Sequence, residues 1–257
     1  MWTSHTASLA PWLAPKLALA RAQISAAHTP RIDSAIESST MDVEQARFNM
    51  IEQQIRPWEV LDQDVLSLLA RVRREEFVPT ACRALAFVDT ELPLPEGQCM
   101  LAPKVEARLL QELALAPHER VLEVGAGSGY MAALLAHQAQ HVTALEIRPT
   151  LAAMARDNLR RAGVPNVDLR QADGSKGMPA QAPFDAIVLS GSVAEVPLDL
   201  LSQLAVGGRL IAVEGQEPVM HAVLFTRVAE RQHKRVELFD TVAPRLSGFA
   251  EPSRFVF

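Results

Sequence analysis

The 257-residue sequence predicts an α/β fold: a doubly wound, mostly parallel sheet with a helical segment before it and antiparallel edge strands after it. Three observations support this prediction. Residues 41–79 show helical periodicity. From residue 120 onward, short apolar runs alternate with helical segments, which is typical of a parallel sheet covered on both faces. Residues 220–243 then alternate apolar and polar side chains, as an antiparallel edge pair would.

The composition indicates a globular protein and excludes several classes. Apolar residues make up 49% of the chain and charged residues 21%, which allows a sizeable core. The net charge of -5 and the lack of a dense Lys/Arg tract give no electrostatic reason to expect a nucleic-acid partner. No apolar run approaches the roughly 18 residues of a membrane helix. Two cysteines, Cys82 and Cys99, suggest reduced thiols in the cytoplasm.

The first forty residues differ from the rest of the chain. They are rich in Ala, Ser and Thr, contain three prolines and show no sustained helical period, so we expect residues 1–40 to be a disordered extension. Met41 is the expected natural start. Residues 41–257 are expected to form one domain, with helices and a loop in 41–103 and an α/β core in 104–257. The apolar C-terminal end, residues 252–257, is expected to dock on the body.

The helical segment is punctuated by Pro57 and Pro79, and residues 87–103 are predicted to be a loop because prolines and Gly97 crowd this stretch. Pro103 suits the first turn of a following helix. Beyond it, each predicted strand is a short apolar run bounded by turn residues, and Gly163 ends the second intervening helix. The predicted strands are 120–124, 141–146, 167–170, 184–189 and 208–213, and the predicted helices are 130–139 and 151–161.

A glycine-rich turn, Gly125-Ala126-Gly127-Ser128-Gly129, directly follows the first strand of this series. Such a turn lets the backbone approach a ligand closely, and the next helix offers free N–H groups. Any strand-to-helix turn collects glycines, so the turn alone does not identify the ligand. A dinucleotide dehydrogenase wants G-x-G-x-x-G. Here Tyr130 occupies the last glycine position, and Glu123 places negative charge where two phosphates would sit, which makes the dehydrogenase a minor alternative.

Three acids, Glu123, Glu146 and Asp173, stand at the ends of three consecutive predicted strands. Glu146 can accept hydrogen bonds from ribose hydroxyls, and Asp173 can accept one from an adenine amino group. Together with the turn they predict a Rossmann-like, class I methyltransferase that binds S-adenosylmethionine, whose amino group and sulfonium tolerate nearby carboxylates. The predicted cofactor-binding residues are Glu123, Gly125, Ala126, Gly127, Ser128, Gly129, Glu146, Ile147, Asp173 and Gly174.

Two other patterns predict no further chemistry. His137 and His141 have the spacing of a helical metal pair, but an expected helix boundary separates them and no Glu lies between them, so we expect no metal site. Ser190-Gly191-Ser192 lacks the G-x-S-x-G elbow of hydrolases.

Several further motifs lie outside the glycine turn. They are Arg74-Glu75-Glu76-Phe77-Val78-Pro79, the loop Leu92-Pro93-Leu94-Pro95-Glu96-Gly97-Gln98, and Gln203-Leu204-Ala205-Val206-Gly207-Gly208. Together with Val121-Leu122-Glu123-Val124-Gly125, these motifs make the chain from Met41 to about Gly215 resemble the protein-L-isoaspartate O-methyltransferase family. The resemblance implies methyl transfer from S-adenosylmethionine to the free carboxylate of isoaspartyl residues in damaged proteins, the first step of their repair.

The sequence departs from the family pattern in the loop expected to hold the acceptor. The family reads Thr-Ile-Ser there, with the serine hydroxyl near the acceptor carboxylate, whereas this chain reads Cys99-Met100-Leu101. Leucine cannot donate a hydrogen bond, and a lost bond to a charged group costs about 1.5–3 kcal/mol. The family's Thr-Ala-Ala after the fourth strand becomes Ser190-Gly191-Ser192, so Ser190 or Ser192 can return a hydroxyl from another side.

Three hypotheses follow for function. The chain is an isoaspartate-type carboxyl methyltransferase, a methyltransferase of the same fold with another acceptor, or a cofactor-binding module without turnover. In each case we expect an intact cofactor pocket beside a changed acceptor pocket.

Overall fold

The computed structural model describes residues 35–251, and side chains from residue 42 onward. The chain divides into two compact units, residues 1–46 and 47–257. Helix α2 (Ala35–Met50) begins six residues before Met41. Most of the expected extension, residues 1–34, and the expected docking end, residues 252–257, lie outside the described residues. The division into extension and single domain therefore stays a prediction.

Helical segments open the second unit, as the periodicity predicts, but they are broken into short pieces. A π-helical turn (Ile51–Ile55) leads into a 3-10 turn (Arg56–Trp58), and α3 (Gln63–Arg71) follows. Asp62 caps α3, because its side chain accepts hydrogen bonds from two backbone N–H groups of the first turn. The apolar side chains of α3 are buried.

The predicted loop of residues 87–103 contains a small antiparallel hairpin. Strands β1 (Leu92–Pro93) and β2 (Cys99–Met100) pair with each other, and the Leu94 N–H donates to the Gln98 carbonyl at 2.8 Å. Strands of two residues carry no readable alternation, so the sequence indicated only a loop. Helix α4 (Pro103–Leu113) begins at the predicted proline.

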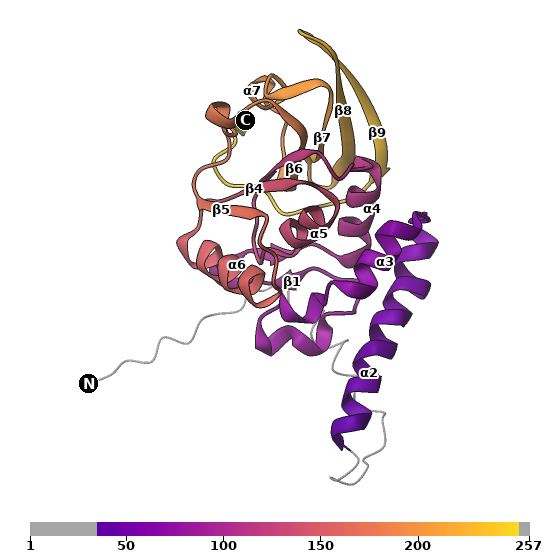
Figure 1. The fold of residues 1–257 in the computed structure, drawn as a ribbon. Coiled ribbons are helices and arrows are strands. Elements are labelled where there is room, and N and C mark those ends of the chain that lie inside the picture. The colour runs from indigo at the N-terminus through magenta and orange to yellow at the C-terminus, as the bar shows by residue number, and fades with distance from the viewer. Residues whose placement is uncertain (1–34, 252–257) are drawn as a thin grey trace, which may run out of the picture. The chain divides into compact units, whose positions relative to one another are not determined.

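The remaining strands form one seven-stranded sheet in the order β5-β4-β3-β6-β7-β8-β9. Its strands are β3 (Arg120–Val124), β4 (His141–Glu146), β5 (Val167–Gln171), β6 (Phe184–Val193), β7 (Leu204–Gln216), β8 (Val219–Ala229) and β9 (Gln232–Asp240). The first five are parallel, whereas β8 and β9 are antiparallel and lie side by side at the C-terminal edge (Figure 1). The predicted α/β fold with antiparallel edge strands is confirmed. Strand β7 extends well beyond the predicted 208–213, because it pairs with both neighbours.

Helices and apolar side chains cover both faces of the sheet. Helices α5 (Tyr130–Gln138) and α6 (Pro149–Arg161) contribute to the same core cluster as α4, and Val121 of β3 points into it. The next residue, Leu122, belongs to a second cluster with α7 (Leu198–Leu201). No helix within residues 35–251 is both long and apolar enough to cross a membrane.

The strand order reverses between β3 and β6. After β3 the chain adds β4 and β5 on one side, then returns to place β6 on the other side of β3. The two crossover connections leave β3 and β6 in opposite directions, which opens a crevice outside the carboxyl ends of the strands. Ligands of such sheets bind in this crevice.

Arg74 is a buried cation that joins the helical segment to the sheet. Its side chain is 1% exposed and forms an ion pair with Glu106 of α4. Its Nε donates to the Ala86 carbonyl at 3.0 Å and its Nη2 to the Leu101 carbonyl at 2.6 Å. The guanidinium also lies 5.0 Å from the ring centre of Tyr130, the first residue of α5.

We expect Arg74→Met to lower the free energy of unfolding by about 3–5 kcal/mol, because it leaves the Glu106 carboxylate buried without its partner. Burial already raises the pKa of Glu106 to about 7 with Arg74 present. The loss should therefore be larger above pH 7 than below it, since a protonated Glu106 tolerates burial better. Urea unfolding at both pH values measures this difference.

Arg73→Met provides the control. Arg73 is 61% exposed and pairs with Glu76 at the surface, so its loss should change stability by no more than about 0.5 kcal/mol. Equal effects of the two substitutions would contradict a stabilising role for the buried pair.

Candidate functional site

The glycine turn after β3 is held against the end of β4. The N–H groups of Gly125 and Ala126 both donate to the Leu145 carbonyl, at 2.8 and 3.1 Å, and the Gly127 N–H donates to Glu146 Oε2 at 2.8 Å. Gly127 has a φ of 55°, a conformation that favours glycine. A Cβ built there would meet the tip of Leu94 at 3.4 Å and the Gly125 carbonyl oxygen at 3.9 Å, so bare backbone faces the crevice.

A pocket occupies the crevice at the carboxyl ends of β3 to β6. Of the residues that the sequence singled out, its lining includes Gly125, Gly127, Glu146, Ile147, Gly174, Cys99 and Ser190. Glu123, Ala126, Ser128, Gly129, Asp173, Met100, Leu101 and Ser192 lie outside the lining. Ala126 and Ser128 are buried within the turn, whose backbone they shape. About half of the positions that the sequence singled out therefore line one pocket, and their part in cofactor binding remains a proposal.

Glu146 is 5% exposed and organises the turn through both carboxylate oxygens. Oε2 accepts from the Gly127 N–H, and Oε1 accepts from the Arg148 N–H at 2.9 Å. Each carboxylate oxygen has lone pairs for a further donor. The side chain can therefore hold the turn and still accept hydrogen bonds from a ligand hydroxyl.

Asp173 and Gly174 follow β5 at the far side of the pocket. Asp173 is exposed, and its Oδ1 accepts from the Ser175 N–H at 2.9 Å. Gly174 packs so closely on β3 that a Cβ there would lie 2.4 Å from a methyl of Val124. The glycine thus lets the loop after β5 approach the glycine turn.

Glu123 differs from its sequence interpretation. Its side chain is fully buried, Oε1 accepts from the Ser190 hydroxyl at 2.8 Å, and Oε2 has no hydrogen-bond partner among the described residues. The pKa of Glu123 is raised to about 8, chiefly by burial and less by the nearby carboxylates of Glu106 and Glu146, against the lowering effect of the Ser190 hydrogen bond. At neutral pH this carboxyl is protonated, so the negative charge assumed from the sequence is absent.

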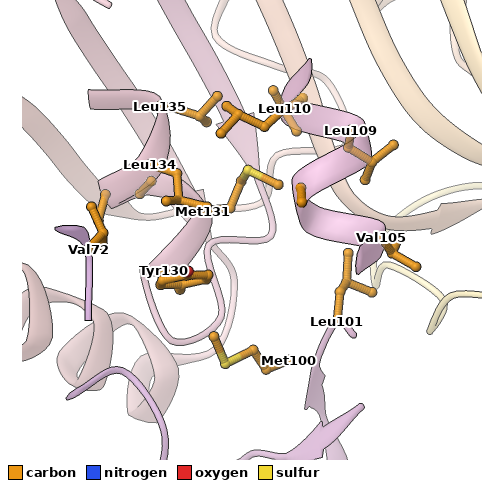
Figure 2. Close-up of a cluster of buried hydrophobic side chains, with 14 of the residues drawn as sticks. Val72, Met100, Leu101, Val105, Leu109, Leu110, Tyr130, Met131, Leu134 and Leu135 are labelled. Atoms are coloured by element: carbon orange, nitrogen blue, oxygen red, sulfur yellow. The ribbon is translucent and has the colours of Figure 1, made fainter. Parts of the chain in front are cut away.

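Of the three residues of the acceptor loop, Cys99 lies at the pocket, whereas Met100 and Leu101 lie in the core. Cys99 lines the pocket, and its Sγ lies 3.7 Å from Glu91 Oε2. Met100 and Leu101 are buried in an apolar cluster, with Leu101 below Val105 and Met100 beneath Tyr130 (Figure 2). The leucine that replaces the family serine thus turns into the core instead of lining the pocket, and only its carbonyl remains engaged, by Arg74.

Sequence reasoning missed the segment of residues 241–251, which we call the strap. It runs across the end of β6, where the Ser192 N–H donates to the Pro244 carbonyl at 2.7 Å and the Leu246 N–H donates to the Ser192 carbonyl at 2.9 Å. Pro244 to Ser247 line the pocket. Pro244 and Gly248 mark the strap as irregular, but no pattern in it reveals where it lies.

Leu246 packs over Gly125 and Gly191 and forms one wall of the pocket. A Cβ on Gly125 would lie 2.6 Å from its Cδ2, and one on Gly191 would lie 2.8 Å from the same atom. The enclosed space that remains is about 50 Å³. Sites for drug-sized ligands measure roughly 300–1,000 Å³. With Leu246 over Gly125 and Gly191, the pocket is therefore smaller than such a site.

The two histidines that the sequence singled out lie apart from the pocket. His137 Nδ1 lies 2.8 Å from the Ala133 carbonyl within α5, and His141 begins β4 at the opposite end from Glu146. Within residues 35–251, no group of three or more His, Cys, Asp or Glu side chains is placed to hold a metal ion.

A switch-point crevice with a glycine turn and an acid at the end of the next strand is the arrangement of class I methyltransferases, which share it with dinucleotide-binding proteins. The sequence profile of the protein-L-isoaspartate(D-aspartate) O-methyltransferase family matches residues 45–240. Protein-L-isoaspartate O-methyltransferase 2 of Anaeromyxobacter sp. Fw109-5 is 42% identical over 224 residues, which cover 86% of this chain and 91% of that protein. The corresponding enzyme of Rhodopseudomonas palustris CGA009 is 41% identical over 192 residues, covering 74% and 88%.

Solved structures show the same fold. A Plasmodium falciparum putative protein-L-isoaspartate O-methyltransferase, in complex with S-adenosyl-L-homocysteine, aligns with a TM-score of 0.69 at 22% identity, over 79% of this chain and 97% of that one. The chain belongs to the protein-L-isoaspartate O-methyltransferase family.

The buried Glu123 predicts a particular pH dependence of stability. Its folded pKa of about 8 exceeds its ordinary value of 4.5, so the folded state keeps a proton that the unfolded chain releases. The contribution of this group is full below about pH 4.5 and is lost as the pH rises towards 8. Gln cannot lose a proton, so the stability of Glu123→Gln relative to the parent should rise between about pH 5 and pH 8. Urea unfolding across this range measures it.

Glu237→Gln on β9 is the control, because the pKa of the exposed Glu237 is lowered, chiefly by hydrogen bonding to Arg235. Its relative stability should stay level or fall over the same range. A level profile for Glu123→Gln would contradict the neutral, buried carboxyl.

Proposed function

We propose that this chain transfers the methyl group of S-adenosylmethionine to the free carboxylate of isoaspartyl residues in damaged proteins. One observation carries the proposal: the family match extends through residues 45–240 and so includes the N-terminal helical segment and the acceptor loop. Methyltransferases with other acceptors share the glycine turn. The segments before it are much more specific to this family.

The donor is S-adenosylmethionine, which supplies an electrophilic methyl group on a sulfonium that is a good leaving group. The residues around the crevice fit it. The bare backbone at Gly127 leaves room for close approach, Glu146 has lone pairs for the ribose hydroxyls, and Ile147, 38% exposed, offers an apolar side chain to the adenine. Asp173 and Gly174 would border the base. Leu246 would leave its position over Gly125 to make room for the cofactor.

The acceptor needs little activation. A carboxylate is ionised at neutral pH, so no general base is required, and the protein's task is to align oxygen, methyl carbon and sulfur while excluding water. The Leu101 side chain takes no part in this alignment. The polar groups that remain at the acceptor side of the pocket include those of Gln98, Cys99, Ser190 and the strap.

The two cysteines in 257 residues are too few for a disulfide framework, and we place the protein in the cytoplasm as part of the same proposal.

Gly127→Val should abolish cofactor binding, because the added side chain would enter the pocket beside Leu94. The backbone conformation is also unfavourable for valine, at a cost of about 1–2 kcal/mol. Isothermal titration with S-adenosylhomocysteine measures the affinity. Gly163→Val is the matched control, since Gly163 has a similar φ of 67° and a Cβ there meets nothing within 4 Å. It should share the loss of stability and keep the affinity. Full affinity in Gly127→Val would refute the pocket assignment.

The function itself is tested with two synthetic peptides that differ only in an isoaspartyl or an aspartyl linkage. We expect transfer of labelled methyl from S-adenosylmethionine to the isoaspartyl peptide alone. If neither peptide is labelled but another component of a cell extract is, the result would favour a methyltransferase with a different acceptor. The departure from the family pattern at Cys99-Met100-Leu101 is the observation behind this alternative. Cofactor binding without labelling of peptides or extract would indicate a module without turnover.

A further inference from the structure

Arg245 places a cation at one end of the pocket, on the strap. It follows Pro244 and pairs with Ser192 of β6 through a parallel bridge, and it lines the pocket together with Cys99 and Ser190. The neighbouring strands fix which end this is. Glu146 and Gly174 follow β4 and β5, whereas Arg245 lies against β6 and β7, on the opposite side of β3. The nucleoside groups belong to the first side, so Arg245 stands at the acceptor side.

The guanidinium of Arg245 is held through two of its nitrogens, and the third has no partner among the described residues. Nε pairs with Glu251 Oε1 at 2.9 Å, and Nη2 donates to the Gly215 carbonyl at 2.8 Å. Nη1 is buried and has no hydrogen-bond partner among the described residues. Arginine cannot lose its charge, and a buried donor without a partner is costly. A buried donor without a protein partner is satisfied by a water, an ion or a ligand.

A hydroxyl lies next to this cation. Ser192 is fully buried, its backbone bridges to Arg245, and its Oγ has no partner in the described part of the chain. Ser190, two residues earlier on β6, already donates its hydroxyl to Glu123. Ser192 lies behind the lining and Ser190 is engaged, so the unused donor among these pocket residues is the charged Nη1 of Arg245, which suits a carboxylate.

We propose that Arg245 binds the carboxylate of the methyl acceptor, in place of the hydroxyl lost where Leu101 turns into the core. The inference rests on the proposed function, because it concerns the acceptor of the same reaction. Arg245 acts on binding more than on the transfer step. The carboxylate is anionic when it binds and loses its charge as its oxygen bonds to the methyl carbon, so the ion pair is stronger before the transition state than in it.

The kinetic test compares Arg245→Leu and Arg245→Lys with the parent protein on the isoaspartyl peptide. We expect Arg245→Leu to raise KM by on the order of tenfold to a hundredfold with a much smaller change in kcat, and Arg245→Lys to recover part of the loss. The Kd of S-adenosylhomocysteine should stay within about twofold in both variants. Arg235→Leu is the control, because Arg235 pairs with Glu214 and Glu237 on the β9 edge, away from the pocket, and its KM should not change.

A merely structural role would give a different result. If Arg245 only anchors the strap, Arg245→Leu would weaken the cofactor and the peptide alike and Arg245→Lys would not help, which would overturn the inference. An unchanged KM in Arg245→Leu would also overturn it while leaving the methyltransferase function intact.

Peptide binding without turnover separates this inference from the function. Calorimetry with the isoaspartyl peptide, in the presence of saturating S-adenosylhomocysteine, should show binding that Arg245→Leu weakens by on the order of tenfold or more. If the parent protein binds the peptide in this way but transfers no methyl group, the proposed function fails and the inference stands. If the parent protein does not bind the peptide, the inference fails.

Discussion

The buried guanidinium of Arg74 is the interaction on which the site depends. It is bound by the Ala86 and Leu101 carbonyls and by Glu106, and it faces the ring of Tyr130. These partners come from the segment before the hairpin, from the acceptor loop, from α4 and from the helix that follows the glycine turn. A single charged group thus fixes the acceptor loop relative to the turn. No apolar residue could satisfy two carbonyls and a carboxylate at once.

The carboxyl groups of Glu106, Glu123 and Glu146 lie on one face of the sheet, and their surroundings differ. Burial leaves Glu123 protonated at neutral pH, and Glu106 is ionised only in part, because its pKa lies near 7. Glu146 lies at the crevice, where backbone N–H groups donate to both of its oxygens. Glu146 is the one acid among the described residues that line the pocket, and it lies at the β4 end. A cationic cofactor and an anionic acceptor can then meet without strong local repulsion.

The sequence predicted the fold well where burial dictates the pattern. The bounds of β3 and β4 match the predicted strands, because central parallel strands are buried on both faces and read as short apolar runs between turns. It predicted the donor side of the site for a related reason, since acids at successive strand ends in a parallel sheet must converge on one edge. Gly125, Gly127 and Glu146 all line the pocket.

Other features depended on tertiary contacts that the sequence does not reveal. Leu101 looked like a pocket residue, because local sequence does not say which side of an irregular loop faces the core. Glu123 looked charged, because desolvation depends on the helices packed over it. The strap follows β9 directly, but it is distant in sequence from the other strand ends that it covers. It also has no periodicity. Only the folded chain therefore shows that Arg245 and Leu246 belong to the site.

The separation of the pocket's two sides has an evolutionary consequence. The proposed donor side is built from the turns after β3, β4 and β5, within about fifty consecutive residues, whereas the opposite side draws on β6, the hairpin loop and the strap. Substitutions on one side need not disturb the other. A lineage can therefore exchange a serine in one loop for an arginine in another, and so retune which molecules are modified, while the machinery that supplies the transferred group is inherited unaltered.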